Sequence, residues 1–104
     1  MNDIYFTITG TNFRYGQDFF EPGQQVKLIR DPDNEHDKEA IKVEMPGLGQ
    51  VGWVANSVNT VLGESHSAGW LCDKIFDGTT GTVLYVLPQG VVCKLDVTTN
   101  DYLR

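Results

Sequence analysis

The chain has 104 residues and carries eight Lys or Arg against fourteen Asp or Glu, which gives a net charge of −6. Its length is that of one typical domain, and we treat residues 1–104 as one domain. The acidic balance argues against a partner held mainly by a broad positive field, such as bulk duplex DNA or an anionic membrane. Because the chain lacks a long apolar stretch and a basic N-terminal flank, we expect a soluble cytoplasmic protein without a membrane span or signal peptide.

Alternating apolar and polar residues predict four strands in the first half of the chain. Ile4, Phe6 and Ile8 alternate with Tyr and Thr, which is typical of a half-buried strand. After an aromatic but aperiodic stretch and a Glu-Pro-Gly turn, a second strand is expected over residues 25–30. A polar loop then leads to a third strand over residues 40–45. A proline- and glycine-rich turn leads to a fourth strand over residues 50–54.

Residues 56–64 are the one segment with convincing helical spacing. Asn56 or Ser57 can cap the first turn by accepting a hydrogen bond from an early N–H. The apolar residues Val58, Val61 and Leu62 are spaced to share one buried face. The segment therefore predicts a short helix.

Further strands are expected over residues 70–76, 82–87 and 91–97, with a hairpin turn at residues 88–90. Many short strands and one short helix predict a mostly β domain, either a small barrel or a sandwich. A closed barrel would also remove exposed strand edges.

Two short patterns suggest ligand sites but lack the surroundings that those sites need. Residues 47–52 match the G-x-G-x-x-G dinucleotide pattern, yet they continue as a strand rather than opening a helix, so they indicate a hairpin turn. Asp31, Asp33 and Glu35 alternate as in a calcium loop, but His36 and Lys42 stand where that loop needs Gly and Glu. We expect no metal and no cofactor.

Nothing at local spacing indicates catalysis. Cys72 and Cys93 both lie in apolar segments, and we interpret them as buried, reduced cysteines. No nucleophile stands beside a base in the sequence, and a chain of this size leaves little room for a deep cleft. We therefore expect a protein that is not an enzyme.

A longer pattern in the middle of the chain is more specific. A strand ending in Arg30-Asp31-Pro32 is followed by Asn34, by Asp37 three residues later, and then by an Ala-Ile-x-Val strand at residues 40–43. A Val-Gly-aromatic strand ending in Trp53 comes next. This pattern resembles the HIRAN domain, a module of certain SWI/SNF-type helicases that also occurs as small stand-alone bacterial proteins. The resemblance extends over residues 4–76, and the last hairpin fits in outline.

The resemblance implies a fold, a ligand and a set of site residues. It implies a small modified OB-like β-barrel of about six or seven short strands with one short helix. Helicase-linked HIRAN domains bind the 3′ end of single-stranded DNA, which implies that Arg14 pairs with a phosphate and Tyr15 stacks on the terminal base. Asp37 would accept a hydrogen bond from the 3′-hydroxyl, a test that a terminal phosphate would fail. The residues implied as nucleic-acid contacts are Arg14, Tyr15, Asn34, His36, Asp37, Trp53 and Asn56.

The chain departs from the DNA-binding pattern at three of these positions. His36 replaces a Tyr, while Trp53 and Asn56 stand where DNA-binding members carry a His and a Lys that contact phosphates. Trp53 can stack but cannot neutralise a phosphate. Six acids against two lysines between residues 31 and 44 would also repel a phosphate backbone.

Each of these residues also has a structural interpretation. Asn34 and Asp37 can build the turn by accepting hydrogen bonds from backbone amides. Arg14 and His36 can be solvated surface residues. Tyr15 and Trp53 can fill the edge of the core, and Asn56 can cap a helix.

We therefore hold two functional hypotheses. The first is a non-catalytic module that recognises single-stranded DNA 3′ ends, alongside a DNA-processing partner protein. The second is a protein-interaction or adaptor module that keeps the barrel but has lost DNA binding, which the acidic charge and the replaced basic positions favour.

Overall fold

The computed structural model describes residues 3–13 and 15–96. In chain order its elements are β1 (Tyr5–Thr9), the 3-10 helix η1 (Thr11–Phe13), β2 (Gln25–Arg30), β3 (Ile41–Met45), β4 (Gly49–Val54), α1 (Ala68–Leu71), β5 (Thr79–Leu87) and β6 (Gly90–Leu95).

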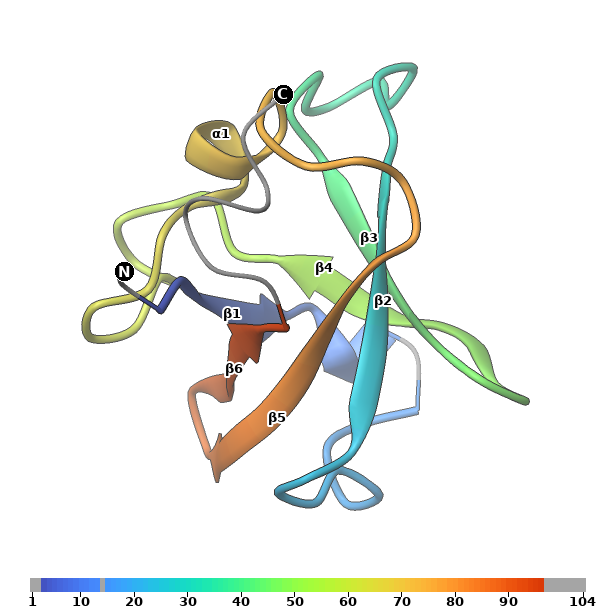
Figure 1. The fold of residues 1–104 in the computed structure, drawn as a ribbon, viewed down its shortest axis with the longest axis vertical. Coiled ribbons are helices and arrows are strands. Elements are labelled where there is room, and N and C mark those ends of the chain that lie inside the picture. Colours follow the sequence, from blue (N-terminus) through green and yellow to red (C-terminus); the bar gives the residue numbers. More distant parts are fainter. Residues whose placement is uncertain (1–2, 14, 97–104) are drawn as a thin grey trace.

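The strands close into an antiparallel barrel in the order β1-β4-β3-β2-β5-β6, and β6 returns to pair with β1 (Figure 1). The closure is uneven, because β1 registers with β6 from Tyr5 to Ile8 but with β4 only through Ile8 and Thr9. The predicted mostly β barrel is confirmed, with six strands in the part of the chain that the structure describes.

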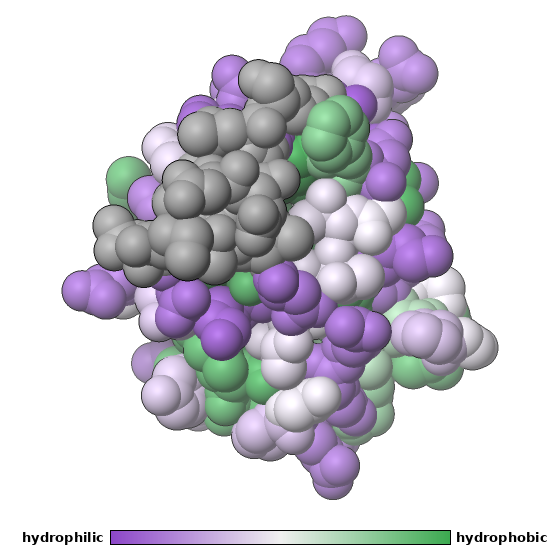
Figure 2. Space-filling view, in the orientation of Figure 1, coloured by the Kyte–Doolittle hydropathy of each residue, from purple (hydrophilic) through white to green (hydrophobic). Residues whose placement is uncertain are grey.

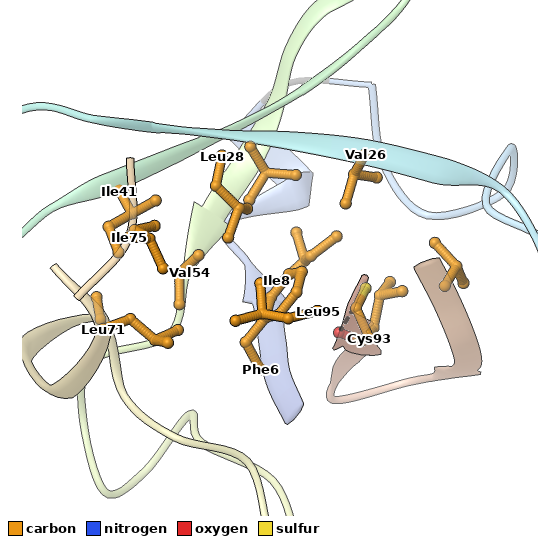
Figure 3. Packing of buried hydrophobic residues seen from close by; sticks show 14 of the residues in the cluster. Phe6, Ile8, Val26, Leu28, Ile41, Val54, Leu71, Ile75, Cys93 and Leu95 are labelled. Atoms are coloured by element: carbon orange, nitrogen blue, oxygen red, sulfur yellow. Dashed lines mark hydrogen bonds between the residues drawn. The ribbon is translucent and has the colours of Figure 1, made fainter. Parts of the chain in front are cut away.

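The predicted alternation forms the core. Phe6, Ile8, Leu28, Ile41 and Val43 are fully buried. Figure 3 shows side chains from several strands meeting inside the barrel, with Leu71 and Ile75 beside Ile41 and Val54 at one end. The strands that supply these side chains, β1, β2 and β3, are among those predicted from the sequence.

Two glycines let the backbone pass where a side chain would not fit. A Cβ atom on Gly52 would lie 2.7 Å from Ile8 Cγ2 and 2.8 Å from the Thr9 carbonyl oxygen, so β4 can approach β1 only because this residue has no side chain. A Cβ atom on Gly81 would lie 2.7 Å from the Phe6 ring. Gly81 therefore leaves the space that the fully buried Phe6 ring occupies.

The glycine-rich pattern at residues 47–52 is a hairpin, as predicted. Leu48 N–H donates to the Met45 carbonyl at 3.1 Å between β3 and β4. Gly47 and Gly49 have φ values of 83° and 76°, the left-handed region that favours glycine. The chain then continues as β4, which confirms a turn followed by a strand.

The predicted helix over residues 56–64 is wrong. These residues form turns, and the Val58 side chain is 95% exposed rather than part of a buried face. Thr60 N–H and Val61 N–H both donate to the Ser57 carbonyl at 2.9 Å, so the helical spacing gives one turn that does not propagate.

The predicted strand over residues 70–76 is also wrong. Its first residues belong to α1, and a turn follows. Ser67 begins this helix, because its hydroxyl accepts from Trp70 N–H at 3.2 Å. One face then buries Ala68 and Leu71 against the barrel.

The last hairpin agrees with the expectation in type and differs in extent. β5 begins at Thr79, earlier than expected, and its register with β6 shifts between Val83 and Tyr85. β6 ends at Leu95, and residue 97 of the expected strand lies outside the described residues.

The two cysteines are free thiols in different surroundings. Cys93 is buried in the barrel, and burial raises the pKa of its thiol to about 12, which keeps it protonated and unreactive. Cys72 is half-buried, and its pKa is raised first by burial and then by the charges of Glu39 and Asp73. Within residues 3–13 and 15–96, no helix is long and apolar enough to cross a membrane.

Truncating Leu71 and Val58 tests where the helix lies. Leu71→Ala should lower the free energy of unfolding by about 2–5 kcal/mol, because its side chain is fully buried. Val58→Ala should change it by less than about 0.5 kcal/mol, because the side chain is exposed. Urea denaturation measures both changes. A large loss of unfolding free energy in Val58→Ala would instead support a buried helix over residues 56–64.

A carboxylate ties three strands together at one end of the barrel. Asp96 accepts hydrogen bonds from Thr80 and Thr82 hydroxyls, each at 2.6 Å, and from Gln25 Nε2 at 2.9 Å. Partial desolvation raises the pKa of Asp96, but these hydrogen bonds outweigh it and hold the pKa below its ordinary value.

This arrangement predicts an acid-dependent loss of stability. Because the pKa is lower in the folded than in the unfolded chain, Asp96 stabilises the fold above its ordinary pKa, and this stability is lost as the pH falls through the folded value. Asp96→Asn should therefore narrow the difference in unfolding free energy between neutral and acidic pH, and Thr82→Val should narrow it less. An unchanged difference in Asp96→Asn would contradict the assignment.

Candidate functional site

The loop between β2 and β3 is built around Asn34. Asp31 N–H donates to the Ala40 carbonyl at 2.8 Å and closes the base of the loop. Inside it, Asn34 Oδ1 accepts from His36 N–H at 2.9 Å and from Asp37 N–H at 3.0 Å. The motif asparagine therefore shapes the backbone that presents His36 and Asp37, which agrees with its structural interpretation.

Asp37 is half-buried and uses each carboxylate oxygen once among the described residues. Oδ1 accepts from Glu39 N–H at 2.9 Å, and Oδ2 accepts from Asn56 Nδ2 at 3.0 Å. A carboxylate offers about four acceptor positions. These two bonds orient the group and leave it able to accept a further hydrogen bond from a ligand hydroxyl.

Asn56 joins the loop to α1. Its Nδ2 donates to Glu39 Oε1 at 3.2 Å as well as to Asp37, and its Oδ1 accepts from Gly69 N–H at 2.7 Å. A Cβ atom on Gly69 would lie 2.6 Å from Glu39 Oε1, so a larger residue here would push the exposed Glu39 side chain away from Asn56. Asn56 thus binds the first turn of α1, not the helix predicted to start at Asn56 itself.

Five of the seven predicted site residues line one open hollow of about 510 Å³. They are Asn34, His36, Asp37, Trp53 and Asn56. Trp53, on β4, is half-buried with its ring near Gly10, where a Cβ atom would lie 3.0 Å from Trp53 Cδ1. His36 is exposed on the β2–β3 loop. The hollow therefore combines an aromatic wall with a carboxylate.

The two remaining predicted site residues are Tyr15 and Arg14, and Tyr15 is not among the residues that line the hollow. Tyr15 is 57% exposed, its hydroxyl donates to the Leu48 carbonyl at 3.3 Å, and its ring meets Phe19 edge-on, away from the residues that line the hollow. Arg14 lies outside the described residues. The predicted convergence of Tyr15 with Asp37 is therefore not found.

The hollow also contains hydroxyl groups that the sequence reasoning missed. Thr9, Ser57 and Thr60 line it, with Thr60 Oγ1 donating to the Ser57 carbonyl at 3.1 Å. Short polar residues in turns and strands are common, so their type gave no signal. These hydroxyls are identified only by the fold, which brings the end of β1 and the turn after β4 together at the hollow.

The electrostatics of the hollow are acidic. Of the described residues that line it, none is Lys or Arg, and Asp37 is the acid among them. The end of the molecule that carries the β2–β3 loop is mainly hydrophilic (Figure 2). No group of three or more metal-ligating side chains occurs among the described residues, and Asp31 Oδ2 accepts from Asn34 Nδ2 at 3.3 Å within the loop. The site therefore suits stacking and hydrogen bonding better than phosphate neutralisation.

The loop motif and the barrel agree with a known family. The model of the HIRAN domain family matches residues 1–84. The chain belongs to the HIRAN family. HIRAN domains are generally DNA-binding modules.

A solved structure shares the fold. The crystal structure of the HIRAN domain of human HLTF is similar with a TM-score of 0.60 and 21% sequence identity, covering 90% of this chain and 74% of that one. No curated protein matches the chain in sequence. At this identity the likeness supports the HIRAN barrel and leaves the site residues to be argued from this chain's own geometry.

Substitutions of Asn56 test the link between loop and helix. Asn56→Ala should lower the unfolding free energy by about 1–3 kcal/mol, because it leaves Gly69 N–H and the two carboxylates without a shared partner. Asn56→Asp should lower it more, since it adds a third carboxylate beside Asp37 and Glu39. The exposed Asn59→Ala is the control, expected within about 0.5 kcal/mol of wild type by urea denaturation.

Proposed function

We propose that this HIRAN domain is a non-catalytic module that binds the 3′ end of single-stranded DNA in the hollow beside Asp37. The observation that carries the proposal is the convergence of Asn34, His36, Asp37, Trp53 and Asn56 on one open hollow. The proposal treats residues 1–104 as one domain that works in the cytoplasm beside a DNA-processing partner.

Asp37 is the group that would recognise the end. Its carboxylate is held by Glu39 N–H and Asn56 Nδ2 and has acceptor capacity left for a 3′-hydroxyl. A terminal phosphate would place negative charge against this half-buried carboxylate, and the two would repel each other. The same group would therefore favour a free hydroxyl and disfavour a blocked end.

Trp53 and His36 would hold the terminal nucleotide. Stacking of a base on an aromatic ring contributes ~1–3 kcal/mol and tolerates any base. Trp53 stands on a strand, and its ring lies beside Gly10, which leaves room for it there. His36, on the exposed loop, would close over the base from the other wall.

The acidity of the chain limits this function without preventing it. With no Lys or Arg among the described residues that line the hollow, few phosphates would be neutralised there. Few counterions would then be released, so binding should depend only weakly on salt. The domain would capture ends rather than coat strands.

A protein-interaction module is the second candidate function. A separate groove of about 370 Å³ lies along β5 and β6, and it includes Tyr85 and Leu87, which are 62% and 40% exposed. Exposed aromatic and aliphatic side chains that gather in one place are typical of surfaces that bind proteins. This function would use the barrel without the hollow at Asp37.

Fluorescence anisotropy with two matched oligothymidines tests the proposal. One carries a 3′-hydroxyl and the other a 3′-phosphate, each with a 5′ label, at about 50 and 200 mM salt. Wild-type protein should bind the hydroxyl form at least about tenfold more tightly, with a shallow salt dependence. Equal binding of the two, or no binding to either at high micromolar protein, would favour the interaction module.

Variants of one loop make the test specific. Asp37→Ala should remove the preference for the hydroxyl, and Asp37→Asn should lessen the penalty on the phosphate because it removes the charge while keeping the shape. Asp33→Ala is the matched control: it removes one acid from the same loop at an exposed position outside the hollow and should keep the preference. Thermal melting checks that each variant is folded.

A further inference from the structure

A second hollow adjoins the one beside Asp37. It measures about 460 Å³, within the range of ~300–1,000 Å³ typical of small-molecule sites. The two hollows share Asn56 and Ser57, so they lie on either side of these two residues. The other lining residues are Val58, Val61, Ser65, His66, Ser67 and Trp70.

One wall of the second hollow is a pair of parallel rings. The His66 and Trp70 ring centroids lie 3.8 Å apart with an angle of 15° between the planes. Trp70 belongs to α1 and packs against the core, and His66 N–H donates to the Tyr5 carbonyl at 2.7 Å. These contacts place the two rings at the hollow, where another flat ring can stack on the face of His66 that Trp70 does not cover.

A positive charge lies beside the ring pair. Lys74 Nζ is 4.5 Å from the Trp70 ring centroid and donates to the Trp70 carbonyl at 2.8 Å. Lys74 also pairs with Asp73 at 3.3 Å, but the Asp73 side chain is largely exposed to solvent. A solvent-exposed ion pair is weak, so Asp73 would compete only weakly with an anion for Lys74. Lys74 does not line the second hollow itself, but it lies over Trp70, which does, and so places a cation beside it.

Ser65, which lines the second hollow, has an unpaired side-chain oxygen among the described residues. Ser65 Oγ is buried and has no hydrogen-bond partner among the described residues. A buried hydroxyl without a partner costs free energy.

We propose that the second hollow binds the nucleotide that precedes the 3′-terminal one, with its base against the His66–Trp70 ring pair. This inference rests on the proposed function, because it takes Asp37 as the position of the 3′ end. A strand that leaves the first hollow has to pass over Asn56 and Ser57 to reach the second. The ring pair then stacks the base, and Lys74 attracts the phosphate backbone near it.

Binding of short oligothymidines with a free 3′-hydroxyl tests this second site. Affinity should rise about tenfold from one nucleotide to two, because the second base gains a stacking surface. His66→Ala should remove most of this rise, and His66→Phe should keep it because a flat ring is retained. Phe76→Ala, which removes an exposed aromatic outside both hollows, is the matched control and should keep the full rise.

The two tryptophans of the chain report on the two hollows separately. In Trp53→Phe the remaining Trp70 fluorescence should change with two nucleotides and not with one. In Trp70→Phe the Trp53 fluorescence should change with one. Calorimetric melting confirms the fold of each variant before the titrations.

The outcomes separate this inference from the proposed function. If the preference for a 3′-hydroxyl holds but His66→Ala keeps the full rise with length, the second site is overturned and the end-binding function stands. If wild-type protein shows no preference for the hydroxyl, the end-binding function fails, and the inference that rests on it fails too. A Trp70 signal that responds to one nucleotide as strongly as to two would also contradict the assigned order.

Discussion

The close approach of β1 and β4 at Gly52 is the constraint on which the site depends. With a Cβ atom there, Ile8 Cγ2 and the Thr9 carbonyl would both be too near, so the barrel could not close along its shortest pairing. Closure places Trp53, the next residue, with its ring against Gly10, and brings Thr9 to the same hollow. A packing requirement of the core thereby fixes an aromatic wall at the surface.

Asn56 extends this constraint from the strands to the loop and the helix. Asn56 follows Trp53 by three residues, just after the end of β4. Its side-chain amide donates to two carboxylates of the β2–β3 loop, and its side-chain oxygen accepts from Gly69 N–H of α1. Because the two hollows meet at Asn56, whatever fixes this side chain fixes their separation. A residue that stands where DNA-binding members carry a Lys is here the junction of the site. Its value is in geometry instead of charge.

The sequence predicted the parts of the structure that depend on local pattern. The strand over residues 25–30 followed from alternation and the strand over residues 50–54 from the turn before it. The Asn34–Asp37 loop followed from a motif whose hydrogen bonds are mostly local. The segment from residue 56 to residue 76 was assigned wrongly, because the four residues of α1 are too few to show a helical period. Its start is set by Ser67 and Asn56, and the second contact spans 13 residues. Likewise, nothing local could reveal that Tyr15 turns toward Leu48 rather than toward Asp37.

The acidic charge acquires a different meaning if the proposed site is the binding site. A net charge of −6 opposes any partner that binds through many phosphates. A pocket that recognises one hydroxyl and stacks one or two bases needs few such contacts, and the acids around it raise the energy of internal phosphates more than that of a free end. Negative charge near the hollow would then act as a filter, because it disfavours continuous strands and blocked ends alike. The replaced basic positions are in this sense consistent with selectivity gained by repulsion, a common way in which binding sites reject competing ligands.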